Sequence, residues 1–376
     1  MSSIPTTDAA LPVTDFLRQP RHRYDDPLAR VWLTCAARVG FTVVRSRETY
    51  ASSDGQGRLL IATEDQFDPD DNLAQMIFHE LCHALVEGEA GENVPDWGLD
   101  NTRMGNPWRE HACLRLQAWL AGSVGLRDFF APTTDFRVSF WESLPADPFA
   151  APAESGGRRD RSCVAARLGA WRASQARWAP HLFAALRSSA QIAACVPRTD
   201  ATHQPGDSSA HRLESLWNTA LPAPPVHPAG HAVVADYHGE HGCTDCAWGF
   251  MSRHRLRCRH VPQRVLDQAA PACTRYEAAV ALDCQTCGAC CREAYHSVEV
   301  SSRDPVNSTH PELVVIHETH RKLRRMGDHC AALRGGENPV SDYTCAIYAD
   351  RPRTCREFTR GSGHCLDARR RVGLSL

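Results

Sequence analysis

The sequence predicts an α+β fold in two parts: an N-terminal domain with a small sheet and several helices, and a small, irregular C-terminal domain rich in cysteine. Three observations support this prediction. Several helix-like segments and two strand-like segments occupy the chain up to about residue 195. Five of the 17 cysteines precede residue 240 while twelve follow it, and a stretch rich in Pro, Ser, Thr and His separates the two parts. We therefore expect domains at 1–196 and 237–376, joined by a linker at 197–236.

The N-terminal elements are predicted from hydrophobic periodicity. Apolar residues with helical spacing predict helices at 26–39, 72–87, 108–122 and, with a break at Pro180, 163–195. Runs of β-branched residues predict strands at 41–45 and 58–63, with turn residues at 52–57 between them. Asp70 or Asp71 is expected to cap the second helix, and Gly88 with Gly91 to end it.

The second helix carries the pattern HExxH within "FHELCHALVEGE", residues 78–89. His79 and His83 are one helical turn apart, so both imidazoles can reach a single ion. Glu80 lies beside them, where it can accept a proton from a metal-bound water. Apolar neighbours indicate that this helix is buried, and Cys82 is expected to be an ordinary core thiol.

A third ligand is needed to complete such a site. Val86 and Glu89 stand where the metzincin extension would have Gly and His, which excludes that class. Glu87 is two turns from His79, about 12 Å along the axis, and is too far away to share the ion. Glu110, at the start of the next helix, is the best candidate, and His111 is either a rival third ligand or a transition-state stabiliser.

The stretch 26–123, with HELCH followed by "EHACLRLQAWL", resembles the gluzincin class of zincin metallopeptidases, most closely small bacterial phage-repressor-cleaving proteases. The resemblance implies that His79, His83 and Glu110 bind Zn²⁺ and that Glu80 is the general base. It also implies an edge strand, here 58–63, ahead of the helix. The substrate would then be a peptide or protein. Cys113 is expected to be a core thiol, like Cys82.

The C-terminal part begins its densest cysteine run at "DCQTCGACCREAY". Two-residue gaps let successive thiolates surround one ion, and neighbouring side chains in extended backbone point apart, so Cys290 and Cys291 can serve different sites. The adjacent pair also breaks ferredoxin spacing. The candidate ligands of this region are Cys284, Cys287, Cys290, Cys291, Cys330, Cys345, Cys355 and Cys365.

The pattern CxxCxxCC, followed by "IYADRPRTCREF" and a last cysteine, resembles the bacterial YkgJ-like cysteine-cluster family over about 284–370. The resemblance implies binding of zinc, iron or an iron–sulfur cluster by these eight cysteines. Upstream of them, a CxxC and two later cysteines form a further candidate four-ligand set, with His241 and His260 as alternates. The set is Cys243, Cys246, Cys258 and Cys273.

Composition narrows the remaining alternatives. Hydrophobic residues make up 43% of the chain, and no apolar run is long enough to cross a membrane. The start of the chain lacks the features of a secretory signal, so a cytoplasmic protein with reduced thiols is expected. The net charge of -2 gives no argument for nucleic acid, and the basic stretches 253–260 and 320–325 are interpreted as solvated faces.

Three functions remain open from the sequence. The first is a zinc-dependent peptidase that also carries a metal-binding cysteine module. The second is a non-enzymatic metal-binding or metal-handling protein. The third is a redox or modifying enzyme that uses an iron–sulfur cluster in the tail. No nucleotide-binding motif of the GxGxxG or P-loop type is found in the sequence.

Overall fold

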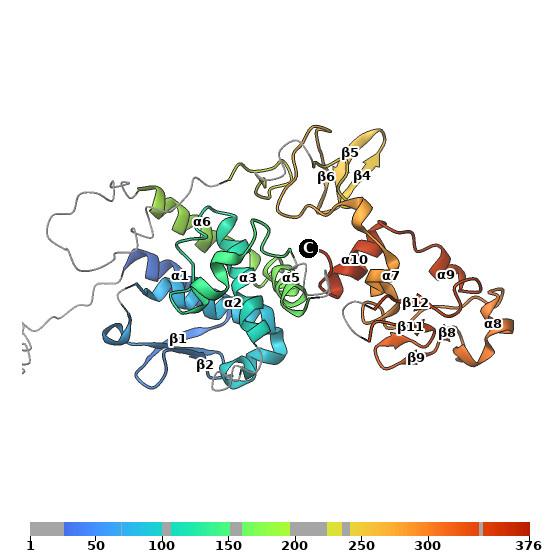
Figure 1. Cartoon of the computed structure of the whole chain (residues 1–376), viewed down its shortest axis with the longest axis horizontal. Coiled ribbons are helices and arrows are strands. Elements are labelled where there is room, and N and C mark those ends of the chain that lie inside the picture. Colours follow the sequence, from blue (N-terminus) through green and yellow to red (C-terminus); the bar gives the residue numbers. More distant parts are fainter. Residues whose placement is uncertain are drawn as a thin grey trace, which may run out of the picture.

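The structure is a computed structural model of the whole chain. It describes residues 26–68, 70–99, 107–150, 160–195, 224–234, 241–337 and 341–376. Figure 1 shows the N-terminal helices and sheet on one side and the cysteine-rich elements on the other. Most of the predicted linker lies outside the described residues; its end, 224–234, pairs with the C-terminal part through bridges such as Val233 with Cys273.

The N-terminal sheet has three strands, β1 (Thr42–Ser46), β2 (Ala51–Ser53) and β3 (Arg58–Ala62), in the order β1-β3-β2. β3 is parallel to β1 and antiparallel to β2. Both predicted strands are present, but β2 lies partly in the stretch predicted as a turn. The expectation that the strand before the HExxH helix is an edge strand is therefore wrong, because β2 covers its second side and forms the edge instead.

Within its described residues, the N-terminal part has five longer α-helices and one short one. They are α1 (Pro27–Val39), α2 (Leu73–Glu92), α3 (Pro107–Gly122), α4 (Phe136–Ser139), α5 (Arg161–Ala173) and α6 (Ala179–Cys195). The predicted break near Pro180 is confirmed: α5 ends before it, and Pro180 lies in the first turn of α6, where its missing N–H costs no hydrogen bond.

Helix α2 begins and ends differently from the prediction. Its N-cap is Asn72, not either of the two preceding aspartates. The Asn72 side chain accepts the N–H of Gln75, and the Gln75 side chain accepts the N–H of Asn72. This reciprocal pair satisfies two backbone donors that would otherwise be unpaired. Gly88, with a φ of 68°, is non-helical and ends the first helical stretch as predicted, but a second stretch follows directly, so α2 as a whole continues to Glu92.

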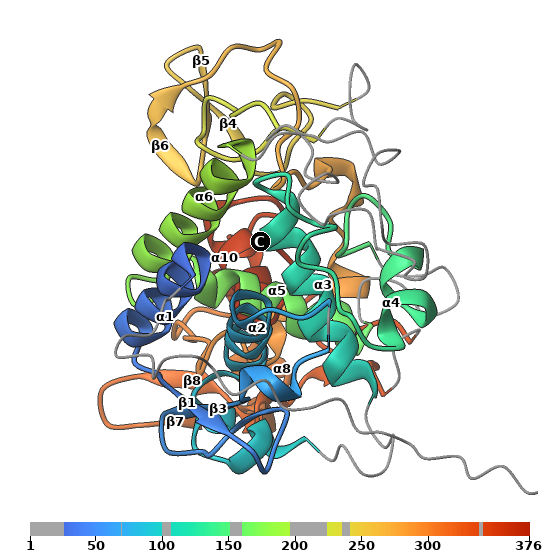
Figure 2. The ribbon, with the colours of Figure 1, turned by 90° about the vertical axis from the view of Figure 1, so that its left-hand side faces the viewer.

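Helix α2 lies at the centre of the N-terminal core, between α1, α3 and α5 (Figure 2). Trp32 of α1, Phe78 of α2 and Phe130 form an aromatic cluster with ring centroids 4.7 to 5.5 Å apart. All three side chains are fully buried. Burial of each such side chain contributes roughly 1.5–3 kcal/mol, and the packing fixes which face of α2 meets α3.

The C-terminal part consists of short elements. An antiparallel sheet contains β4 (Gly249–Ser252), β5 (Arg255–Cys258) and β6 (Val261–Val265). Three strand pairs follow: β7 (Val314–Ile316) with β8 (Arg321–Leu323), β9 (Arg325–Met326) with β10 (His329–Cys330), and β11 (Leu333–Arg334) with β12 (Thr344–Cys345). The helices are α7 (Cys284–Cys287), α8 (Val306–Thr309), α9 (Arg353–Arg356) and α10 (Gly363–Arg371).

The end of the chain joins the two parts. Helix α10 packs against α5, and Leu376 packs against the N-terminal core. Gly373 has a φ of 68°, and a Cβ there would lie 2.5 Å from the carbonyl oxygen of Val164 in α5. The mixed helices and small sheets confirm the α+β prediction. In the part of the chain that the structure describes, no helix has the length and apolar character needed to cross a bilayer.

Candidate metal centres

Three side chains of the HExxH region converge between α2 and α3. Nε2 of His79 lies 3.1 Å from Nε2 of His83. The carboxylate oxygens of Glu110 lie 3.6 Å from Nε2 of His79 and 3.2 Å from Nε2 of His83. The four-residue spacing puts both imidazoles on one face of α2, and the packing of α3 against that face supplies the carboxylate.

These separations suit one zinc ion. Zinc bonds of about 2.0–2.2 Å to nitrogen and oxygen, at tetrahedral angles, place ligand atoms roughly 3.3–3.6 Å apart. The three donors therefore fit the ion with little rearrangement. The side chains of His79 and Glu110 are 23% and 20% exposed, whereas that of His83 is 4% exposed. A fourth position would thus face solvent on the side of His79 and Glu110.

Cys113 also lies close to the two histidines. Donor atoms of His79, His83 and Cys113 all lie within 4.8 Å of one another. The sulfur of Cys113, however, is 3.8 Å from Nδ1 of His79, the ring nitrogen that does not face Glu110. Burial, followed by the charge of Glu110, raises the pKa of the Cys113 thiol well above its usual range. Glu110 therefore completes the site better, and Cys113, like Cys82, is buried as predicted.

Gln117 orients the ring of His79. Its Oε1 lies 2.9 Å from Nδ1 of His79, and its amide nitrogen donates to the carbonyl oxygen of Phe130. The second bond fixes the amide, so Nδ1 of His79 must be the donor and Nε2 keeps its lone pair for a metal. Gln117 was not among the residues expected from the sequence. Its position seven residues after Glu110, two turns along the same face of the helix, is the signal that could have identified it.

Glu80 is held by a tryptophan that the sequence analysis also missed. Nε1 of Trp97 donates to Oε2 of Glu80 at 2.7 Å, and both side chains are buried. Trp97 lies in a 3-10 turn (Pro95–Gly98) in which Asp96 and Trp97 have φ values of 50° and 56°. Such angles are uncommon outside glycine and are often found at functional sites. The bond engages Oε2 of Glu80, and Oε1 is the other oxygen of that carboxylate.

Arg109 holds this turn against α2. Its guanidinium donates to both carboxylate oxygens of Glu87, at 2.9 and 2.6 Å, and to the carbonyl oxygens of Trp97 and Gly98. Such a two-pronged ion pair fixes orientation as well as distance. Glu87 therefore serves this ion pair, in agreement with the sequence argument that it lies too far from His79 to share a metal.

His83 and Glu110 are an ion pair at short range. Burial by itself would lower the pKa of His83, but the carboxylates of Glu110, Glu80 and Glu87 together outweigh burial and raise that pKa to about 9. Burial by itself would raise the pKa of Glu110, but His83 and then His79 lower it to about 2. A metal ion that binds here must displace the proton from His83, because only a neutral imidazole is a ligand.

His111, the rival third ligand, is directed elsewhere. Its ring stacks on that of Phe140, with centroids 3.9 Å apart and planes at 4°, and it also adjoins Phe136. It is Glu110 that contacts both His79 and His83.

The eight cysteines between 284 and 365 line one cavity of about 800 Å³. We group them by their electrostatic neighbours and by the apolar cluster in which they pack; Cys290 acts on members of both groups and lies where the groups meet. The first tail set is Cys284, Cys287, Cys290 and Cys365. The second tail set is Cys291, Cys330, Cys345 and Cys355. Packing agrees, since Cys287 and Cys290 share one apolar cluster while the whole second set lies in another.

The two tail sets meet at adjacent residues. Gly288, with a φ of 61°, ends α7, and the following 3-10 turn carries Cys290 and Cys291. Their sulfur atoms lie 4.0 Å apart. A hydrogen bond between them lowers the pKa of Cys290 and raises that of Cys291. Either sulfur can be the donor in this contact.

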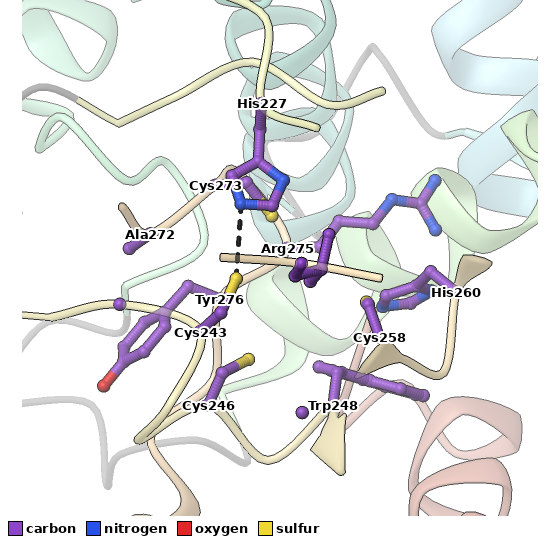
Figure 3. Close-up of a pocket in the computed structure, with 13 residues that line it drawn as sticks. His227, Cys243, Cys246, Trp248, Cys258, His260, Ala272, Cys273, Arg275 and Tyr276 are labelled. Carbon is purple, nitrogen blue, oxygen red and sulfur yellow. Dashed lines mark hydrogen bonds between the residues drawn. The ribbon is translucent and has the colours of Figure 1, made fainter. Parts of the chain in front are cut away.

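The upstream set, Cys243, Cys246, Cys258 and Cys273, lines a separate cavity of about 10 Å³ (Figure 3). The alternate ligand His241 is instead 3.0 Å from a carboxylate oxygen of Asp245, whereas His260 does line the cavity. His227, in the predicted linker, was missed because no spacing pattern marks it. In both cavities, no three sulfur atoms of described cysteines lie within 4.8 Å of one another, so the thiols line the space without meeting at one point.

Comparisons with known proteins bear on the tail. Residues 283–370 match the family model "CxxCxxCC: Putative zinc- or iron-chelating domain". The chain is 30% identical over 103 residues to "Uncharacterized protein YkgJ" of Escherichia coli O157:H7, covering 24% of this chain and 93% of that protein. The chain belongs to this CxxCxxCC family. Its zinc- or iron-chelating domain contains both tail sets, and it includes neither the HExxH helix nor the upstream set. No solved structure matches the chain.

Proposed function

We propose that His79, His83 and Glu110 hold a zinc ion for the hydrolysis of peptide bonds, in a chain whose CxxCxxCC domain separately chelates zinc or iron. The observation that carries the proposal is the 3.1 to 3.6 Å spacing of the three donor groups. Two histidines and a carboxylate leave a fourth position open, as in catalytic zinc sites; structural sites fill all four positions with protein ligands.

Glu80 supplies the proton transfer. A zinc ion bound at this site would polarise a substrate carbonyl and acidify a water molecule. With Oε2 held by Trp97, Oε1 of Glu80 takes the proton from the water and returns it to the leaving amine. Because Glu80 is buried, its carboxylate is oriented by the hydrogen bond from Trp97 and not by hydrogen bonds to bulk water.

The substrate is a peptide or protein segment that approaches the exposed side of His79 and Glu110. The edge strand β2 contacts both α2 and the turn that carries Trp97. An extended peptide could pair with this edge, since β3 is already paired on both sides.

The proposal is tested with the full chain and the variant Glu80→Gln. Denatured casein and a peptide mixture serve as substrates, and mass spectrometry detects new N-termini. We expect Glu80→Gln to keep its zinc and to lose hydrolysis by a factor of about 10²–10⁴. Glu89→Gln, on the exposed part of the same helix, is the matched control. Hydrolysis that survives Glu80→Gln rejects the mechanism, and a zinc-loaded wild type that cleaves neither substrate favours a metal-handling protein.

A further inference from the structure

Four cysteines outside the family match surround a space suited to one ion. Cys243, Cys246, Cys258 and Cys273 line a cavity of about 10 Å³, close to the volume of one water-sized sphere. Burial and then the charges of each of the other three thiols raise the pKa of Cys243, which shows that the four lie close together. The cavity is far smaller than the one in the tail, so it suits a single ion better than a cluster with inorganic sulfide.

Burial raises the pKa of Cys246 and of Cys258, and backbone N–H groups two and three residues after each cysteine act against burial. They belong to Trp248 and Gly249 for Cys246, and to His260 and Val261 for Cys258. The N–H of Gly249 also donates to the carbonyl oxygen of Cys246 at 3.0 Å and closes the turn after the CxxC segment. Backbone N–H groups close to a sulfur favour the thiolate, which is the form that binds a metal.

The close turn around Cys246 requires a glycine. A Cβ on Gly249 would lie 2.4 Å from the carbonyl oxygen of Cys243 and 3.2 Å from that of Cys246. Only a residue without a side chain lets the strand β4 start this close to the CxxC segment.

His227 contributes a further donor from the segment 224–234. The N–H of Ala229 donates to Nδ1 of His227 at 2.9 Å, so in the neutral ring the proton is on Nε2. Nε2 lies 3.2 Å from the sulfur of Cys243 (Figure 3), and His227 is only 2% exposed. A ring nitrogen that carries a proton cannot bind a metal, so the contact is an N–H···S hydrogen bond.

Positive side chains balance the charge of the four sulfur atoms. Four thiolates with one Zn²⁺ carry a net charge of -2, which is costly to bury without partners. Arg275 lines the cavity and acts electrostatically on Cys258 and Cys273. Arg259 acts on Cys258 as well.

We propose that Cys243, Cys246, Cys258 and Cys273 bind one structural zinc ion, and that His227 donates a hydrogen bond to the Cys243 thiolate. Zinc–sulfur bonds of about 2.3 Å place ligand sulfurs roughly 3.8 Å apart. In the structure no three of these four sulfur atoms lie within 4.8 Å of one another, so the sulfurs must move closer together to bind the ion. A change of cysteine rotamer moves a sulfur by about 3 Å, so side-chain rotation is enough to close the site. The proposal is independent of the hydrolase site.

Alkylation of the full-length, zinc-loaded wild type tests the four ligands without any mutation. N-ethylmaleimide is added before and after zinc removal with a chelator, and peptide mapping locates the modified cysteines. We expect the four to react only after zinc removal. Cys35 and Cys82, buried in the N-terminal core, should stay protected throughout, and exposed Cys195 should react throughout. Reaction of the four before chelation, or protection unchanged after it, overturns the zinc site.

Two variants of His227 test the hydrogen bond. His227→Phe removes the donor, while His227→Gln can keep an N–H group near the sulfur. We expect both full-length variants to keep the wild-type zinc content. Zinc release from His227→Phe should be about 10-fold faster than from the wild type. When the solution is acidified, this variant should also release zinc at a higher pH, because the Cys243 thiolate without its hydrogen bond is more basic. His227→Gln should restore the wild-type behaviour.

Cys246→Ser should lose one equivalent of zinc, and Cys195→Ser none. A loss of one equivalent in both His227 variants would make His227 a ligand and overturn the hydrogen-bond assignment. Release curves that coincide for wild type and His227→Phe would overturn it equally.

Discussion

Arg369 of α10 forms a buried ion pair with Glu277, a residue that precedes the CxxCxxCC domain. Nη2 of Arg369 lies 2.5 Å from Oε1 of Glu277, and the side chains of Arg369 and Glu277 are 3% and 12% exposed. Ser375 donates to the other oxygen of Glu277 at 2.6 Å. The carbonyl oxygen of Glu277 accepts the N–H of Ala247, next to Cys246. One arginine therefore connects the end of the chain, the tail helix and the upstream cysteine set.

Arg369→Met should destabilise the protein by about 3–5 kcal/mol, since it leaves the Glu277 carboxylate buried without its counter-charge. Urea unfolding measures the change. The matched control is Arg353→Met, which breaks a pair of the same length to Glu357 with both side chains exposed. The control should leave the unfolding midpoint unchanged. Equal shifts in the two variants would contradict the role assigned to burial.

Gln117→Leu should weaken zinc binding at the HExxH site by about 10- to 100-fold, because the ring of His79 loses the partner that fixes its tautomer. Competition with a chelating dye measures the affinity. Gln75→Leu is the control: Gln75 is also buried, and it hydrogen-bonds to the carbonyl oxygen of Phe129 away from the site. It should lower stability and leave zinc affinity intact. The orienting role fails if Gln117→Leu binds zinc as tightly as the wild type.

Trp97→Phe should retain zinc and lose most of the hydrolytic activity, because the Glu80 carboxylate is no longer held. Loss of a hydrogen bond to a buried carboxylate should also cost about 1–3 kcal/mol of stability. Trp32→Phe is a suitable comparison, as it removes a bond of 3.0 Å to Ser189 Oγ in the same core. It should lower stability with hydrolysis preserved. Equal losses of hydrolysis in both variants would mean that Trp97 acts through stability alone.

Cys290→Ser and Cys291→Ser should each remove a different share of the tail metal. If the two tail sets are separate sites, each single variant loses one site and the double variant loses both. Elemental analysis after anaerobic purification gives the count, and the visible spectrum distinguishes colourless zinc from iron–sulfur absorption. Loss of all tail metal in either single variant would indicate one shared cluster in the 800 Å³ cavity.

Much of the N-terminal site could be predicted from the sequence because it depends on local periodicity. His79 and His83 share a face in any α-helix, and Glu110 was expected from its place in the next helix. Trp97 and Gln117 could not be predicted in the same way. Their partners are 17 and 38 residues away, and their contacts depend on how α3 and the turn before it pack on α2.

The edge-strand error has the same origin. The composition of residues 58–63 predicts a strand, but it does not show whether one or two other strands pair with it. Only the pairing of β2 with β3 placed that strand in the centre of the sheet.

The sequence by itself determined which candidate ligand patterns the chain carries, because the type of ligand and its short spacing are properties of neighbouring residues. These patterns are the HExxH helix, the CxxCxxCC pattern and a further CxxC. Only the tertiary structure decided how these groups combine. It brought Glu110 to the two histidines, divided the tail thiols at Cys290 and Cys291, and turned His227 toward Cys243. Each of these contacts joins residues far apart in the chain or depends on a local turn, and such distances are set by packing rather than by periodicity.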